Sequence, residues 1–366
     1  MKLIMDRETL LSPLQGVSGV IERRQSMPVL SHVLLKAADN RIQFTGTDVE
    51  VEQTITIEYP VDKPGETTLP ARKLLDICRF LPERAKVEIA VDGDRAWIKS
   101  GKSKFALATL PAREFPNIGV VTSILAVSVE AGRLKTILKD TEFAMAQQDV
   151  RYYLNGLLLE VRESRIRVAA TDGHRLAVNE LEVKTDLQEM HQVIIPRKGV
   201  SELSRMLEGT IEPTEIRIGA NHIQVKVGDR TLTSKLIDGR FPDYERIMMQ
   251  KGDKVVVAER EPLRQALARV SIISSEKFRG VRIALESDLL RASSHNAERE
   301  EAEEEIEVDY TGEPLEIGFN VTYLQDALSV IQTERVRLEF LDSKSSCLIR
   351  PVEGGGGTHV VMPIRL

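Results

Sequence analysis

The chain has 366 residues, of which 42% are hydrophobic and 29% are charged, a balance that excludes a fibrous or largely disordered protein. Its net charge of −6 at pH 7 means that any nucleic-acid interface must be a local basic face on an acidic body. No apolar run approaches the length of a membrane span, and the opening residues turn acidic too early for a signal peptide. We therefore expect a cytoplasmic protein with no membrane partner and two or three domains.

Six helices are expected where apolar residues recur every three or four positions. The segments between them alternate apolar and polar residues, which is typical of strands, with tight turns at Asp39-Asn40, Asp92-Gly93 and Gly228-Asp229. Long and short helices alternate along the chain, over residues 8–20, 73–81, 132–146, 199–207, 262–271 and 321–331.

Short strings recur at an offset of roughly 125 residues, which indicates an internal repeat. Thr47-Asp48 returns as Thr171-Asp172, and Phe115-Pro116 returns as Phe241-Pro242. A third copy has diverged further. The repeat predicts an α+β fold of three strand-rich domains with two helices each, over residues 1–121, 122–251 and 252–366.

Basic residues concentrate on the expected helices. A single helix of this kind is most simply a solvated face, but equivalent helices of repeated domains can face one common side, where their positive fields add. The last helix has no basic residue and breaks the pattern. The basic helix residues are Arg72, Lys73, Arg79, Arg133, Lys135, Lys139, Arg197, Lys198, Arg205, Arg264 and Arg269.

Two further segments are strongly charged and of opposite sign. An expected hairpin near Arg95 is basic, whereas residues 298–309 hold eight acids against one base, Arg299. Such an acidic run is usually solvated, but opposed edges at the two ends of a chain also predict head-to-tail pairing. The expected interface consists of Arg95, Lys102, Lys104, Ile272, Ile273, Glu298, Glu301 and Glu304, with the two isoleucines as its apolar centre.

Catalysis is not favoured by the sequence. Asp172 and His174 could form an acid–base pair, but Asp172-Gly173 is more simply a turn. Cys78 and Cys347 have no partner spacing, and no nucleophile elbow, phosphate loop or metal-ligand pattern occurs. We expect a non-enzyme without a cofactor or metal.

Four strings resemble the bacterial DNA polymerase III beta subunit, the replicative sliding clamp, and the resemblance extends over the whole chain. They are QDVRYYLNG (148–156), ATDGHRLA (170–177), DGRFPDY (238–244) and VMPIRL (361–366). The resemblance implies a homodimeric ring, closed head to tail, with helices lining the hole and sheets outside. It implies that the ring encircles duplex DNA without sequence specificity and tethers DNA polymerases, the clamp loader and other replication and repair proteins.

The resemblance also implies contacts with DNA. Tyr152 and Tyr153 are neighbours in an expected strand, so one of the two is expected to point into the core. The segment 21–27 lacks the glycines usual in the family, which bears on Arg24. Together with the basic helix positions, the expected DNA contacts are Arg24, Arg72, Lys73, Gln148, Tyr152, Tyr153, Arg197 and Lys198.

A hydrophobic pocket for short linear peptides is implied between the second and third domains. A purely structural alternative is that residues 360–362 form the last strand of the third domain and complete its sheet. This alternative leaves the following four residues unexplained. The chain also carries Ile364 where methionine is more usual. The implied pocket residues are Leu154, Thr171, Gly173, His174, Arg175, Leu176, Pro242, Arg246, Ile247, Asn320, Tyr323, Ser346, Val360, Val361, Met362, Pro363, Ile364, Arg365 and Leu366.

A second function class remains open from the residues alone. A protein-only oligomeric scaffold could bind peptide motifs without touching nucleic acid. Such a scaffold would not need basic inner helices, so retention on circular DNA separates the two readings.

Overall fold

The computed structural model describes residues 1–22, 27–119, 121–185, 189–249, 252–274, 279–354 and 356–365. The chain divides into two compact units. The first unit consists of Met1–Gly132 with Lys198–Leu236, and the second consists of Arg133–Arg197 with Ile237–Leu366. In the described part of the chain, no helix is long and apolar enough to cross a membrane.

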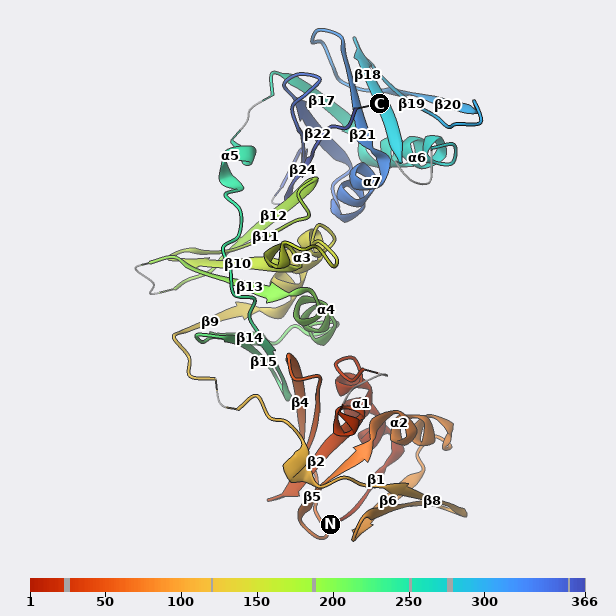
Figure 1. Cartoon of the computed structure of the whole chain (residues 1–366), viewed down its shortest axis with the longest axis vertical. Coiled ribbons are helices and arrows are strands. Elements are labelled where there is room, and N and C mark those ends of the chain that lie inside the picture. Colours follow the sequence, from red (N-terminus) through yellow and green to blue (C-terminus); the bar gives the residue numbers. More distant parts are fainter. Residues whose placement is uncertain are drawn as a thin grey trace. The chain divides into compact units, whose positions relative to one another are not determined.

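In the first unit, helices α1 and α2 pack on antiparallel sheets (Figure 1). One sheet has the order β1-β6-β7-β8, and the other has the order β5-β2-β3-β4-β16-β15-β14-β9. The helices are α1 (Arg7–Val17) and α2 (Ala71–Phe80). The strands are β1 (Lys2–Asp6), β2 (His32–Ala38), β3 (Arg41–Thr47), β4 (Val51–Glu58), β5 (Gly65–Pro70), β6 (Lys86–Asp92), β7 (Arg95–Ser100), β8 (Ser103–Ala108), β9 (Leu125–Glu130), β14 (Pro213–Ile218), β15 (His222–Val227) and β16 (Arg230–Lys235).

The second unit repeats this plan with one eight-stranded and one four-stranded sheet. Their orders are β13-β10-β11-β12-β24-β23-β22-β17 and β20-β19-β18-β21. Helices α5 (Glu245–Met248), α6 (Arg260–Ser271) and α7 (Val321–Val330) belong to this unit. Its strands are β10 (Gly156–Arg162), β11 (Arg165–Thr171), β12 (Arg175–Glu182), β13 (His191–Pro196), β17 (Lys254–Glu259), β18 (Gly280–Glu286), β19 (Leu289–His295), β20 (Glu301–Glu307), β21 (Leu315–Asn320), β22 (Arg335–Phe340), β23 (Cys347–Pro351) and β24 (Thr358–Val361).

Each eight-stranded sheet joins two four-stranded halves through one antiparallel pair. In the first unit β4 pairs with β16, and in the second β12 pairs with β24. We call each of these joining pairs a seam. Because the two strands of a seam form hydrogen bonds with each other, successive repeats share one continuous sheet. Helices α3 (Ala131–Glu142) and α4 (Arg197–Met206) each cross the division between the units.

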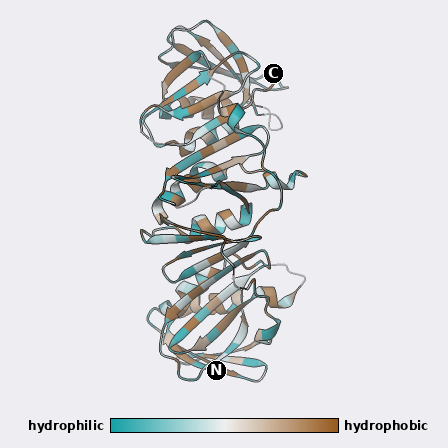
Figure 2. Ribbon diagram, turned by 90° about the vertical axis from the view of Figure 1, so that its left-hand side faces the viewer, coloured by the Kyte–Doolittle hydropathy of each residue, from teal (hydrophilic) through white to brown (hydrophobic). Residues whose placement is uncertain are grey.

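The local sequence explains these elements. Along β9 the residues alternate between buried and exposed, and Figure 2 shows the same alternation of hydrophobic and hydrophilic residues on many strands. Helix α2 buries Leu74, Leu75 and Cys78 on one face, as a helical period requires. The β2–β3 turn has Asp39 and Asn40 at φ 51° and 54°, a left-handed pair that twists with the strands.

The expected helices are present, with ends shifted by a few residues. Helix α1 ends at Val17 instead of residue 20, and α3 ends at Glu142 instead of 146. The four-residue helix α5 was not expected. The sequence predicted a strand at Tyr152 and Tyr153, and this was wrong. Both residues lie in a short 3₁₀-helix, η3 (Tyr152–Leu154).

A half-buried acid on α3, Asp140, predicts a pH dependence of the stability. Asp140 accepts a hydrogen bond of 2.7 Å from the side-chain amide of Asn179, and burial raises the pKa of Asp140 from 3.8 to about 6. The folded state therefore holds this proton more tightly than the unfolded state. This contribution to stability is complete below the unfolded pKa of 3.8 and is lost as the pH rises through about 6.

We expect Asp140→Asn to raise stability at neutral pH by about 1 kcal/mol, after allowance for partial exposure, because the amide keeps the hydrogen bond without a buried charge. Thermal unfolding at several pH values should show a flatter profile between the two pKa values. An unchanged profile would contradict this role for Asp140.

Candidate functional site

An apolar hollow of about 220 Å³ lies within the second unit. It is formed by η3, the β11–β12 turn, the segment leading into α5, and the end of β24. Its apolar lining and moderate size suit one or two large side chains of a ligand. The lining residues are Arg151, Tyr153, Leu154, Thr171, Gly173, Arg175, Leu176, Pro242, Tyr244, Ile247, Val360 and Met362.

The last strand positions one wall of the hollow. Leu176 of β12 pairs with Val360 of β24, and both side chains are almost fully buried. The Met362 N–H donates to the His174 carbonyl at 2.9 Å, and the Ile364 N–H donates to the Gly318 carbonyl at 2.9 Å. The final strand therefore closes the sheet, and the residues after it continue along β21.

The turn between β11 and β12 builds the floor. Asp172 accepts hydrogen bonds from the backbone N–H groups of His174 and Arg175 at 2.9 and 3.0 Å, and Gly173 has φ +90°. Only glycine adopts that backbone without strain. The prediction that Asp172-Gly173 forms a turn is confirmed.

The guanidinium of Arg175 is hydrogen-bonded within the chain. Its three nitrogens donate to Asp172, to Asp326 and to the Phe143 carbonyl. The guanidinium carbon also lies 4.6 Å from the centre of the Tyr323 ring. These contacts join β12 to α7, while Arg175 also lines the hollow, so its contact with a peptide backbone stays a prediction.

The other predicted pocket residues surround the hollow without lining it. The His174 ring stacks on Tyr323 at 6.4 Å, Asn320 caps α7 by accepting from the Thr322 N–H, and Arg246 pairs with Asp243. Leu366 lies outside the described residues. The predicted residues that do not line the hollow are His174, Arg246, Asn320, Tyr323, Ser346, Val361, Pro363, Ile364 and Arg365.

Three lining residues were not assigned to the pocket. Tyr153 packs against the apolar cluster that contains Phe241 and Val360, whereas Tyr152 is exposed, which agrees with the expectation that one of the two points into the core. Arg151 and Tyr244 lie inside the strings 148–156 and 238–244. These strings pointed to the family, but the two residues were not predicted to line the pocket.

Two larger hollows in the same unit have a different chemistry. They measure about 1160 and 920 Å³ and are lined largely by charged residues, such as Arg269 and Glu305 in the first and Arg165 and Glu182 in the second. Arg335 pairs with Asp309 in the first hollow and Arg165 pairs with Glu180 in the second, so the smaller apolar hollow is the better candidate for a ligand site.

The expected DNA contacts differ in availability. Arg72 and Lys73 are exposed on α2, and Gln148 and Tyr152 are exposed near η3. Arg24 lies outside the described residues.

Two expected contacts are already engaged within the chain. Arg197 donates to the Met145 carbonyl at 2.9 Å. Lys198 donates to Glu22 at 2.7 Å and to Asp48. Burial would lower the pKa of Lys198, but these carboxylates raise it overall. Both side chains therefore have partners within the chain, and their contact with DNA stays a prediction.

Six of the eight expected interface residues lie on or beside strands, and Ile272 and Ile273 directly follow helix α6. β7 and β8 pair in an antiparallel hairpin, which confirms the expected hairpin, and Arg95, Lys102 and Lys104 are exposed on it. Glu298 and Glu301 are exposed at β20, whereas Glu304 pairs with Arg269 at 2.7 Å. Ile272 is 78% exposed and Ile273 is half-buried. The sequence reading missed the exposed Phe80 and Phe105, which only the structure reveals as surface residues.

No group of three or more metal-ligating side chains occurs among the residues that the structure describes. Cys78 and Cys347 are buried, and burial raises the pKa of the Cys78 thiol to about 12, which keeps it unreactive.

Three family models cover the chain in order. The N-terminal, central and C-terminal domains of the DNA polymerase III beta subunit match residues 1–119, 128–243 and 245–365. This chain belongs to that family. The predicted three-domain architecture is confirmed, while the domain boundaries near residues 121 and 251 stay predictions. The family is that of the beta sliding clamp, a non-catalytic processivity factor of DNA replication.

Individual relatives match over their full length. The beta sliding clamp of Pseudomonas putida is 49% identical, and that of Escherichia coli is 46% identical, each over 100% of both chains. The crystal structure of the Pseudomonas aeruginosa sliding clamp bound to griselimycin is 48% identical over 100% of both chains, with a TM-score of 0.97.

The contacts of Lys198 with Glu22 and Asp48 can be tested by substitution. Lys198→Ala should lower the free energy of unfolding by about 1–2 kcal/mol, because it leaves the buried Asp48 without its cation. Lys73→Ala, at an exposed position of α2, should change stability little. Thermal denaturation of both variants checks this. Equal melting temperatures would show that Lys198 is a free surface charge after all.

Proposed function

We propose that this protein is a DNA sliding clamp whose two chains close head to tail around duplex DNA. It acts in the cytoplasm, where bacterial replication takes place, and slides without reading sequence. Its apolar hollow holds short peptides of DNA polymerases, the clamp loader and other replication and repair proteins. The observation that supports the ring is the sheet topology: in the part of the chain that the structure describes, two sheets have eight strands, and two have four strands, half of that number.

The two eight-stranded sheets have equivalent orders around their seams. β4 and β12 end one kind of four-stranded half, and β16 and β24 end the other kind. By the same order, β20 ends a half of the first kind, and β8 ends a half of the second kind. Among the residues that the structure describes, neither strand has a seam partner. A β8–β20 pair between two chains would complete a third sheet of the same design.

The two edges are complementary in charge as well as in topology. Lys102 directly precedes β8 and Lys104 lies within it, whereas β20 carries five glutamates. Exposed strand edges normally avoid pairing, so opposite charges favour the head-to-tail partner and disfavour like edges. Because β8 and β20 are different surfaces, the contact is heterologous, and it generates a closed ring when the rotation closes.

Sequence-blind DNA binding is supported by the exposed cations and by the overall charge. Arg72 and Lys73 can contact phosphates, which carry no sequence information. Arg72 pairs with Asp76 at 3.8 Å, whereas Arg264 pairs more closely with Glu261 and Arg269 with Glu304, each at 2.7 Å. A modest positive field within an acidic body suits a protein that must slide and not adhere.

Peptide capture is supported by the chemistry of the hollow. Leu154, Leu176 and Val360 supply an apolar floor, and Met362 supplies a flexible, 40% exposed side chain at its edge. A family member with a TM-score of 0.97 is described as bound to griselimycin. A protein-only scaffold would share this hollow, so DNA retention decides between the two functions.

Dimer formation is tested by removing the apolar centre of the proposed interface. Ile272→Ala with Ile273→Ala should shift the protein toward monomer in analytical ultracentrifugation, because buried apolar contacts dominate such interfaces. Ile211→Ala, which truncates an isoleucine that is 87% exposed elsewhere, is the matched control. A double variant that remains as dimeric as this control would refute the interface.

Peptide binding is tested at Met362. Met362→Ala should weaken binding of a fluorescein-labelled, leucine- and phenylalanine-containing pentapeptide by about tenfold, because loss of a large apolar contact costs roughly 1–2 kcal/mol. Val352→Ala, at a similarly exposed position of the same unit, should bind normally. Fluorescence anisotropy gives both affinities, and equal affinities would place the peptide elsewhere.

A further inference from the structure

One wall of the hollow comes from a segment that belongs to no sheet. Residues 237–249 run from the end of the central repeat to α5, and Pro242, Tyr244 and Ile247 of this segment line the hollow. The Ile237 N–H donates to the Ile194 carbonyl at 2.9 Å, which ties the start of the segment to β13. The position of the wall then depends on side chains further along.

The first anchor is a buried hydrogen bond from Tyr244. Its hydroxyl donates to Glu160 on β10, a carboxylate residue that is 1% exposed. Gln192 donates to the other oxygen of Glu160 at 2.6 Å, which orients the carboxylate. Burial raises the pKa of Tyr244, so the hydroxyl keeps its proton and remains a donor.

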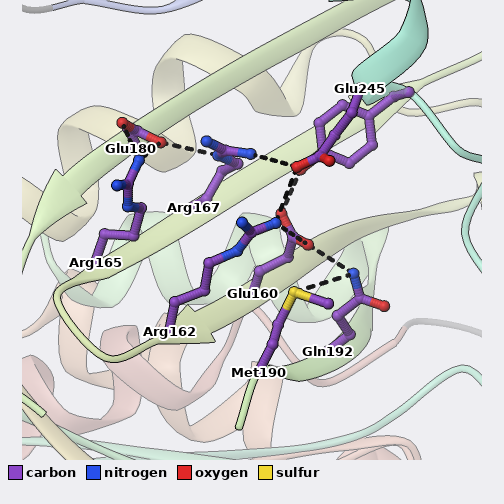
Figure 3. Close-up of polar contacts among 9 residues, drawn as sticks. Glu160, Arg162, Arg165, Arg167, Glu180, Met190, Gln192 and Glu245 are labelled. Atoms are coloured by element: carbon purple, nitrogen blue, oxygen red, sulfur yellow. Dashed lines mark hydrogen bonds and ion pairs between the residues drawn. The ribbon is translucent and has the colours of Figure 1, made fainter. Parts of the chain in front are cut away.

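The second anchor is an ion-pair network at the next residue. Glu245 accepts from Arg162 at 2.9 Å and from Arg167 at 3.0 Å (Figure 3). Arg167 also donates to Glu180 of β12 at 2.8 Å, and Arg165 reaches the same carboxylate. Figure 3 shows Arg162 and Arg167 both reaching one side of Glu245 from the strands beneath it.

The charges of this network balance, and part of it is shielded from water. Three glutamates, Glu160, Glu180 and Glu245, face three arginines on β10 and β11. The Arg167 side chain is only 14% exposed, so its pairs are screened less than surface pairs. Glu245, at 51% exposed, can be changed without opening a core cavity.

We propose that the Glu160–Tyr244 and Glu245–Arg162/Arg167 contacts are the positioning device of the peptide pocket. They hold residues 241–248 in place so that Pro242 and Ile247 form a wall before any peptide arrives. This inference rests on the proposed peptide-binding function. Glu160, Glu245, Arg162 and Arg167 do not line the hollow, so they act through the segment and not on the ligand.

A preformed wall has a kinetic signature. When the binding-competent conformation is only partly populated, the apparent dissociation constant rises by the inverse of that population. Loss of an anchor should therefore slow association and leave dissociation nearly unchanged. Loss of a direct contact has the opposite pattern, because it speeds dissociation.

The test compares Glu245→Gln and Tyr244→Phe with the parent protein. The second variant removes the hydroxyl and keeps the ring that lines the hollow. Glu163→Gln, an exposed residue of the β10–β11 turn, is the control with the same change of charge as Glu245→Gln. Stopped-flow anisotropy with the labelled pentapeptide should show association about three- to tenfold slower in both anchor variants, with dissociation unchanged.

Hydrogen exchange supplies a readout that needs no peptide. Backbone amides of residues 243–249 should exchange faster in both anchor variants than in the parent or in Glu163→Gln, because the segment opens more often. Faster exchange with unchanged association would show that the anchors hold the segment but do not shape the pocket, which overturns the proposal.

The remaining outcomes separate the two hypotheses. A parent protein that binds the peptide, with variants of equal exchange and equal kinetics, would overturn the positioning role and leave the pocket intact. Variants that dissociate faster at an unchanged association rate would also overturn it, since they would mark direct contacts. A parent protein that binds no peptide would overturn the proposed pocket and, with it, the inference.

Discussion

Antiparallel pairing at the seams is the interaction on which the architecture depends. The β4–β16 and β12–β24 ladders convert repeated four-stranded halves into continuous sheets. Each ladder satisfies backbone groups that would otherwise form open edges, so one repeat is completed only by the next. The same rule leaves β8 and β20 incomplete at the two ends of the series. A ring is the arrangement that satisfies both ends at once.

The seams also place the candidate pocket. β24 pairs with β12, and the residues that follow it pass along the Asp172–Arg175 turn and β21. Arg175 then connects this turn to α7 through Asp326. The proposed peptide site thus lies where one repeat completes another, and the separate 237–249 segment closes its remaining side. The backbone contacts that build the sheet also build the candidate pocket.

Much of this could be predicted from the sequence because repeated motifs carry the information. Apolar periodicity located six helices, and Asp39-Asn40 marked its turn because few residues tolerate a left-handed backbone. The four-residue α5 was missed because it is too short to show a helical period. The strand assumed for Tyr152 and Tyr153 was wrong because a 3₁₀ turn leaves no periodic signal.

Side-chain partners were the part that the sequence could not supply. Lys198 looks like a surface cation until Asp48, 150 residues away, is placed beside it. Arg175 looks like a ligand donor until Asp326 and the Phe143 carbonyl occupy its nitrogens. Glu245 and Arg167 are 78 residues apart, and their contact depends on where the α5 segment crosses the sheet. Charge patterns therefore predicted surfaces more reliably than individual roles.

The central claim is that the protein holds DNA by enclosing it, and topology tests this most directly. The protein is loaded onto nicked circular plasmid with a bacterial clamp loader and ATP, separated from free protein by gel filtration, and measured before and after one cut of the plasmid. The account predicts co-elution with the circle and release after the cut, because a ring slides off a free end. Equal retention on circular and linear DNA would contradict enclosure, and no retention on either would favour a protein-only scaffold.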